Sequence, residues 1–197
     1  MATSPYKPGE FIAGLTHLPT QPPHEWLFMR DDSLSAPMKR PVPITDVSGV
    51  PRYYVTHTRS WPSDRYEVAT ADGGRAASIR QRHYGSAWHR AVLADGREID
   101  IRKDFFDADR WLRLKGVGLV LTPWERYRPY ASLSTEDGAD IAWLGYRRTD
   151  ERDGTISTQY AIGIIAPGWE DVTVAVFALV RHEYLDYFDV VRGSGTP

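Results

Sequence analysis

The sequence predicts a mainly β protein, an antiparallel sandwich or barrel, and three features support that fold class. Asp-Gly pairs and related turn signals recur along the chain, and both residues tolerate the positive φ of tight hairpins. Short stretches of β-branched and aromatic residues with a period of two lie between those turns. Near the carboxyl end, residues 172–180 form a continuous apolar run. The absence of amphipathic helices between the strands argues against a parallel α/β sheet.

The strand signals follow one another closely. In the clearest, residues 97–102, Ile99 and Ile101 alternate with polar neighbours. Further candidates, which bring the total to about ten strands, are residues 24–30, 52–57, 66–70, 75–79, 89–93, 111–114, 117–122, 130–134, 141–146 and 156–165. The turn signals are residues 46–49, 72–74, 95–96, 137–138 and 153–154. Gly116 and Gly118 lack the third glycine and the helix of a dinucleotide loop, so we expect a hairpin or bulge there.

The apolar run at residues 172–180 has the composition of a buried element. A helix that is apolar on every side belongs inside a protein or a membrane, and this run is far shorter than the ~20 residues that cross a bilayer. Glu170 and Asp171 precede it, where a helix amino terminus favours negative charge. Its β-branched residues also suit a strand, and we favour the helix.

Composition limits the function classes. With 197 residues and 42% hydrophobic content, the chain can form one well-buried domain. The 24 Lys and Arg residues are balanced by 26 Asp and Glu residues, which argues against nucleic-acid binding. The chain has no Cys, which excludes disulfides, thiolate metal sites and a cysteine nucleophile. No signal peptide is recognisable after Met1, so we expect a cytoplasmic protein.

Prolines mark the domain organisation. Many of the 14 prolines lie near the amino end, and Pro interrupts regular structure. We therefore expect residues 1–23 to form a Pro-rich extended arm, residues 24–191 a single domain and residues 192–197 a flexible tail. The arm either packs on the domain or serves as a docking segment.

The order of elements resembles that of the tubby-like superfamily, in particular its LURP-one-related and phospholipid-scramblase-like branches. The segments that carry the resemblance are residues 44–49, 72–74 and 93–99, followed by residues 160–171 and the apolar run. The resemblance implies a closed antiparallel barrel of about twelve strands around a buried hydrophobic carboxyl-terminal helix. It also implies a non-enzymatic binding or scaffold module for anionic phospholipid headgroups or a protein partner, with peripheral membrane contact and no transmembrane segment.

The strongest candidate site is basic. If Ile79, Ile99 and Leu114 face inward, alternation directs a set of basic side chains outward, and Arg binds phosphate through a bidentate fork. The candidate headgroup-binding residues are Arg80, Arg82, Arg102, Arg113 and Lys115. Because Glu98 and Asp100 are interleaved with them, the other interpretation is an ordinary solvated face.

No catalytic residue, metal ion or cofactor is predicted. The six histidines lack a spacing such as His-Glu-x-x-His, and Asp104, Asp107 and Asp109 lack the glycine and final glutamate of an EF-hand. The seven tryptophans suit carbohydrate stacking or a β core, and we favour the core. The alternative function is a lipocalin-like carrier of a small apolar ligand, which requires residues 172–180 to be a wall strand rather than a plug.

Overall fold

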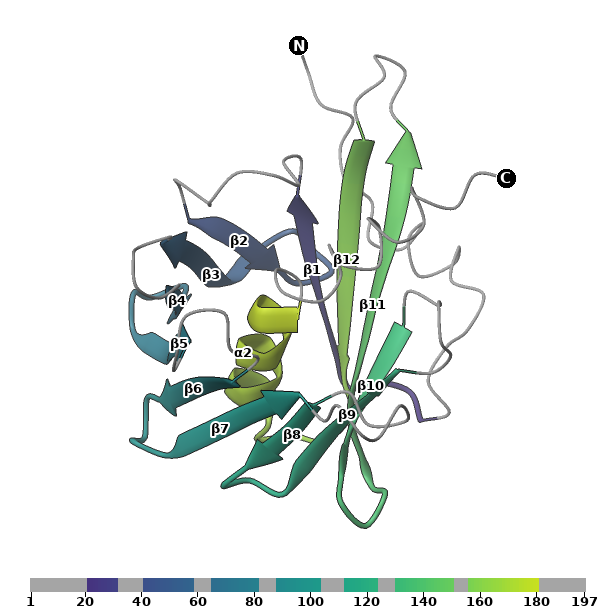
Figure 1. Ribbon diagram of the computed structural model, residues 1–197. Coiled ribbons are helices and arrows are strands. Elements are labelled where there is room, and N and C mark those ends of the chain that lie inside the picture. Colours follow the sequence, from purple (N-terminus) through teal and green to yellow (C-terminus); the bar gives the residue numbers. More distant parts are fainter. Residues whose placement is uncertain are drawn as a thin grey trace, which may run out of the picture.

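The structure, a computed structural model, describes residues 21–31, 41–58, 65–81, 88–103, 112–123, 130–150 and 156–180. Twelve strands in these ranges form one closed antiparallel barrel (Figure 1). The strands are β1 (Glu25–Asp31), β2 (Val42–Thr45), β3 (Pro51–Thr58), β4 (Arg65–Thr70), β5 (Arg75–Gln81), β6 (Trp88–Leu93), β7 (Glu98–Lys103), β8 (Leu112–Lys115), β9 (Leu119–Pro123), β10 (Tyr130–Thr135), β11 (Asp140–Asp150) and β12 (Ile156–Ile164). The predicted mainly β barrel is confirmed.

Each strand pairs with its neighbours in the sequence, and β12 closes the barrel by pairing with β1 from Glu25↔Ile164 to Asp31↔Thr158. Because successive strands alternate in direction, the turns at residues 46–50, 71–74, 94–97, 116–118 and 136–139 lie at the same end of the barrel. We call this the short-turn end. Closure pairs both edges of the sheet, which removes the open edges on which other chains aggregate.

The short turns follow the expected chemistry. Gly96 has a φ of 84°, a conformation that glycine adopts without steric cost, and Asp95 Oδ1 accepts the backbone N–H of Arg97 at 2.9 Å. Gly116 has a φ of 101°, and a Cβ at this position would overlap the carbonyl oxygen of Glu98. At the other predicted turns in the described residues, Gly49, Gly73 and Gly138 also have positive φ, whereas residues 153–154 lie outside the described residues.

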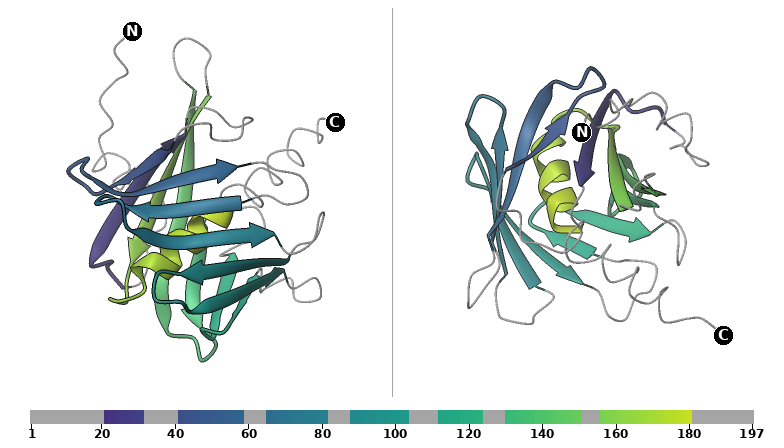
Figure 2. Two further views of the ribbon diagram at one scale, coloured as in Figure 1. Left: turned by 90° about the vertical axis from the view of Figure 1, so that its left-hand side faces the viewer. Right: turned by 90° about the horizontal axis from the view of Figure 1, so that it is seen from above.

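Helix α2 (Glu170–Val180) lies inside the barrel. The right-hand view of Figure 2, from above, shows strands around it. Every residue from Val172 to Val180 is at most 2% exposed, and the helix contacts β4, β5, β6 and β12. Phe177 packs edge-on against Tyr160 of β12, with ring centroids 5.5 Å apart. The prediction of a buried helix rather than a strand is confirmed. At ~1.5–3 kcal/mol for each buried aliphatic or aromatic side chain, this helix contributes a major part of the core.

A second buried layer lies on the outer face of β1, β11 and β12. Phe28 and Trp143 are 0% exposed, although their strand neighbours point into the central core. Trp26 packs edge-on against Trp143 with centroids 5.5 Å apart. Gly145 leaves room for Trp143, because a Cβ there would overlap the indole. A Cβ on Gly163 would overlap Pro23 and crowd Trp26. For Trp143, packing rather than carbohydrate stacking is therefore the role that the structure shows.

The strand prediction missed β2, a four-residue strand that contains Pro43. Proline cannot donate to a sheet ladder, so a short stretch that contains it carries a weak strand signal. The structure nevertheless pairs Pro43 with Tyr54 of β3. Val117, predicted as the start of a strand, lies in the turn before β9. Of the arm expected over residues 1–23, residues 1–20 lie outside the described residues, as does the tail expected over residues 192–197.

Candidate functional site

Four of the five predicted basic residues lie in the strands of one wall of the barrel, β5 to β8. Arg80 is exposed near the end of β5, and Lys115 is exposed at the end of β8. Arg102 of β7 stands opposite Arg113 of β8 in the strand register, whereas Arg82 lies outside the described residues. The inward orientation of Ile79, Ile99 and Leu114 is confirmed, since each is at most 1% exposed within the central core.

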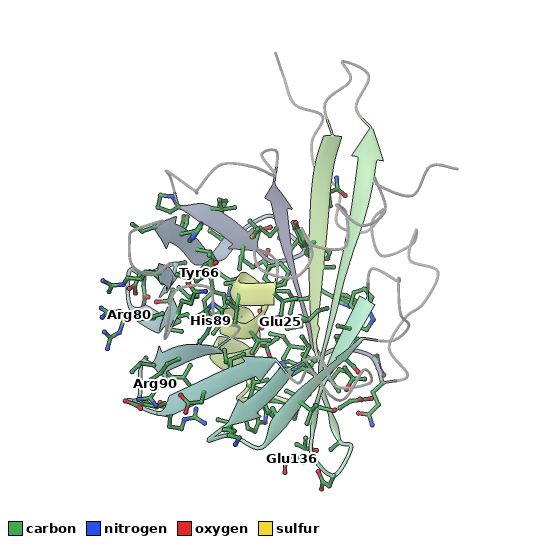
Figure 3. All side chains as sticks on the ribbon, viewed as in Figure 1. Glu25, Tyr66, Arg80, His89, Arg90 and Glu136 are labelled. Atoms are coloured by element: carbon green, nitrogen blue, oxygen red, sulfur yellow. The ribbon has the colours of Figure 1, made fainter. Side chains whose placement is uncertain are left out.

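Strand pairing places Arg80 and Lys115 in one cross-strand row. The row runs Arg65, Arg80, Arg90, Asp100, Lys115 across β4 to β8. In Figure 3, Arg80 points away from the barrel, and Arg90 lies on the same wall. The row contains two of the predicted residues, Arg80 and Lys115, and Asp100 separates Arg90 from Lys115.

Acidic neighbours neutralise part of this row. Arg90 donates from Nε to Asp100 Oδ1 at 2.9 Å and pairs with Glu98 Oε2 at 2.9 Å. The hydrogen bond to Asp100 raises the pKa of the Arg90 guanidinium, which keeps it charged. Arg65 is likewise paired with its neighbour Glu67. Arg65 and Arg90 are therefore neutralised by acidic neighbours, as the interpretation of an ordinary solvated face requires.

Arg80 and Lys115 form no ion pair with any residue that the structure describes, and both are exposed. Three inter-strand steps separate them, or ~14 Å at the usual strand spacing. Arg90 and Asp100 lie between the two side chains in the row. The wall therefore provides separate contact points for anionic groups rather than one closed pocket.

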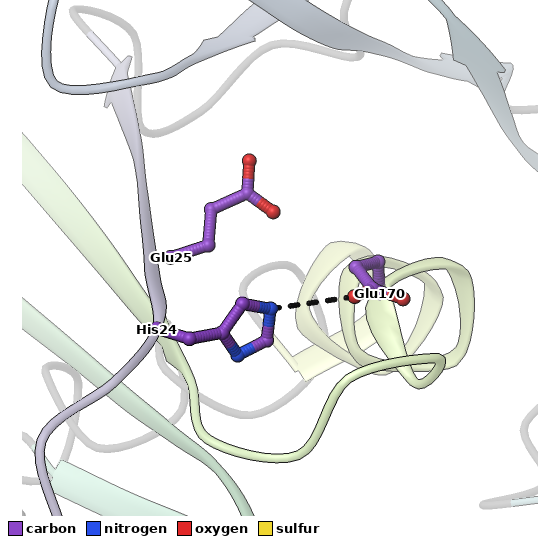
Figure 4. Close-up of side chains that lie close together, drawn as sticks. All are labelled: His24, Glu25 and Glu170. Carbon is purple, nitrogen blue, oxygen red and sulfur yellow. Dashed lines mark ion pairs between the residues drawn. The ribbon is translucent and has the colours of Figure 1, made fainter.

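A second cluster lies at the short-turn end, where β1 begins and α2 begins (Figure 4). His24 precedes β1 and is held there by its backbone N–H, which donates to Ile164 O at 2.9 Å. Its ring Nε2 lies 3.5 Å from Oε1 of Glu170, and its Nδ1 lies 3.4 Å from Ile165 O. Glu25 extends from the adjacent position. One potential ligand atom from each of His24, Glu25 and Glu170 lies within 4.8 Å of the others.

A hydrogen bond in the turn before the helix positions Glu170. It is the first residue of α2, and its Oε1 accepts the backbone N–H of Gly168 at 3.1 Å. The next residue, Asp171, accepts a hydrogen bond of 3.0 Å from the Tyr53 hydroxyl of β3. Burial is the largest cause that raises the pKa of Tyr53 above its ordinary value of 10.0, and the negative charge of Asp171 adds to it. Tyr53 therefore stays protonated and donates.

The sequence predicted the acidic helix start but not this cluster. His24 and Glu170 lie at opposite ends of the domain, so no local spacing relates them. The other two described histidines, His57 and His89, are 3% and 0% exposed. His57 stacks on Tyr66 with ring centroids 4.5 Å apart. These two histidines are therefore packed side chains.

Comparison with known proteins adds little to this geometry. No family model matches the chain, and no match is found among curated proteins. Among solved structures, the chain is similar to the X-ray structure of a protein from Arabidopsis thaliana, with 11% sequence identity and a TM-score of 0.43. The match covers 85% of this chain and 98% of that one. A similarity this distant carries no argument about family or function.

Proposed function

We propose that this protein is a non-enzymatic binding module that contacts anionic phospholipid headgroups through the outer wall of β5 to β8. The observation that carries the proposal is the occupied barrel interior. Residues 172–180 fill it with side chains that are at most 2% exposed, so a ligand has to bind outside. The resemblance of the sequence to the tubby-like superfamily supports the same choice of ligand.

The filled interior argues against the alternative, a carrier of a small apolar ligand. Such a carrier needs an empty lumen lined by apolar side chains. Here the inward residues of the strands and those of α2 form one continuous hydrophobic core. A ligand could enter only if the helix left, which would expose most of that core to water.

The proposed contacts are electrostatic and dispersed. Arg80 and Lys115 project from different strands without acidic partners among the described residues. Arg102 and Arg113 are paired with each other in the register of β7 and β8. A basic side chain near an anionic membrane surface contributes about 1 kcal/mol. No helix among the described residues is long and apolar enough to span a membrane. Binding would thus be peripheral, moderate in strength and sensitive to salt.

Flotation with vesicles of phosphatidylcholine that contain a few per cent of a phosphoinositide tests the proposal. We expect the protein to float with these vesicles at about 50 mM salt and to be released at about 500 mM. The double variant Arg80→Glu, Lys115→Glu should bind at least about tenfold more weakly, since it removes two favourable charges and adds two unfavourable ones.

Arg75→Glu is the matched control. Arg75 is exposed on β5, like Arg80, but lies at the short-turn end of the strand. Its replacement reverses one charge away from the row, as each single substitution of the double variant does within it, and should leave flotation nearly unchanged. Absence of flotation at low salt, or equal losses in control and double variant, would refute the headgroup proposal and leave a protein partner as the ligand to seek.

A further inference from the structure

The cluster at the short-turn end brings together three side chains of the types that bind metal ions, with one ligand atom of each within 4.8 Å of the others. Its ligand atoms are one imidazole nitrogen and carboxylate oxygens, from His24, Glu25 and Glu170. The 3.5 Å between His24 Nε2 and Glu170 Oε1 is close to the ~3.3 Å expected between two ligands of a tetrahedral zinc ion with bonds of ~2.0–2.1 Å. Figure 4 shows the three side chains directed toward a common space beside the first turn of α2.

The imidazole has the orientation that metal-ligating histidines adopt. Nδ1 of His24 faces a backbone carbonyl, Ile165 O, at 3.4 Å. When Nδ1 carries the proton and donates to that carbonyl, the lone pair of Nε2 points toward Glu170. A carbonyl that fixes the tautomer in this way is the usual outer partner of a histidine ligand. Two electron-rich atoms then face each other, an arrangement that a cation between them stabilises.

The surrounding charges favour a cation on balance. Glu25 and Glu170 supply two negative charges, which exceed the roughly +0.5 charge of a helix amino terminus. Asp171 adds negative charge nearby but is occupied by Tyr53, so it does not belong to the ligand set. Arg52 is the competing group, with its guanidinium 3.5 Å from Glu25 Oε1. It is about half exposed and can swing into solvent.

We infer that His24, Glu25 and Glu170 bind one divalent transition-metal ion, for which Zn²⁺ is the natural candidate. Nitrogen and oxygen ligands without sulfur suit Zn²⁺ and Co²⁺. Water completes the coordination, because the site is open to solvent on one side: His24 is 37% exposed and Glu170 is 29% exposed. The ion would join the start of β1 to the start of the buried helix.

Titration of the untagged full chain tests this inference, with Zn²⁺ followed by calorimetry and Co²⁺ by its visible absorption. We expect one ion per chain. His24→Ala and Glu170→Gln should each weaken binding at least about tenfold, since each removes a ligand. Glu136→Gln, which neutralises an exposed carboxylate in the β10–β11 turn at the same end, should bind as the wild type does. A wild type that binds neither ion, or binding that His24→Ala leaves intact, overturns the inference.

Arg52→Ala provides a test that does not depend on removing a ligand. Loss of the competing guanidinium should free Glu25 and tighten binding severalfold, whereas a merely structural cluster would show no such gain. Unchanged or weaker binding in Arg52→Ala counts against Glu25 as a ligand. The metal site and the headgroup wall are independent, so Arg80→Glu, Lys115→Glu should bind metal normally and His24→Ala should still float with vesicles.

Discussion

Replacing Thr173 by Val should stabilise the protein. Thr173 lies in the helix that fills the barrel and is 0% exposed, and its Oγ1 has no hydrogen-bond partner among the described residues. Folding therefore removes this hydroxyl from water without compensation, at a cost of about 1–3 kcal/mol. Valine has nearly the same shape, keeps the β-branch and replaces the hydroxyl by a methyl group that the surrounding core can accept. We expect the free energy of unfolding to rise by about 1–3 kcal/mol.

Urea or guanidinium unfolding, followed by tryptophan fluorescence, measures this change as a higher midpoint with an unchanged slope. For a chain of this size the melting temperature should rise by about 2–4 °C for each kcal/mol. Thr173→Ser is the control, because it keeps the hydroxyl and loses the methyl group, and it should be less stable than the wild type. If Thr173→Val is neutral or destabilising, the hydroxyl is satisfied in solution and the account of an unpaired buried hydroxyl is wrong.

Three further predictions concern the core, the outer aromatic layer and the short-turn end. Phe177→Ala should lower the free energy of unfolding by about 3–5 kcal/mol, measured by denaturant titration, because a fully buried ring leaves a cavity. Gly145→Ala should cost about 1–3 kcal/mol and change the fluorescence of Trp143, since its Cβ would overlap that indole; an unchanged midpoint would contradict the packing described. Tyr53 has a raised pKa in the folded state. Its contribution to the free energy of unfolding is therefore complete below pH 10.0, the ordinary pKa of tyrosine, and is lost as the pH rises above 10.0. Tyr53→Phe should be less stable than the wild type at neutral pH, because it loses the hydrogen bond to Asp171. Between about pH 9 and pH 11 it should lose less stability than the wild type does. Equal slopes of unfolding free energy against pH in the two proteins would exclude this linkage.

Much of the fold could be predicted from short stretches of sequence. The turn at Gly96 and the alternation of Ile99 and Ile101 depend on backbone preferences and side-chain periods that act over a few residues. The apolar run before Val180 is equally local, since its composition alone requires burial. Where local signals conflicted, as at Pro43, the prediction failed, because pairing with β3 outweighed the poor strand propensity of proline.

The sequence by itself determined a mainly β chain, its short turns, its buried carboxyl-terminal helix and the outward direction of Arg80 and Lys115. Only the tertiary structure decided which of the basic side chains meet acidic partners, since Arg90 reaches Asp100 through pairing of β6 with β7. His24 and Glu170 lie near the two ends of the domain in the sequence, and only barrel closure brings them side by side. The physical reason is that turns and alternation arise from contacts between near neighbours in the chain. Convergence of distant side chains depends on strand register and closure, which no short stretch of sequence specifies.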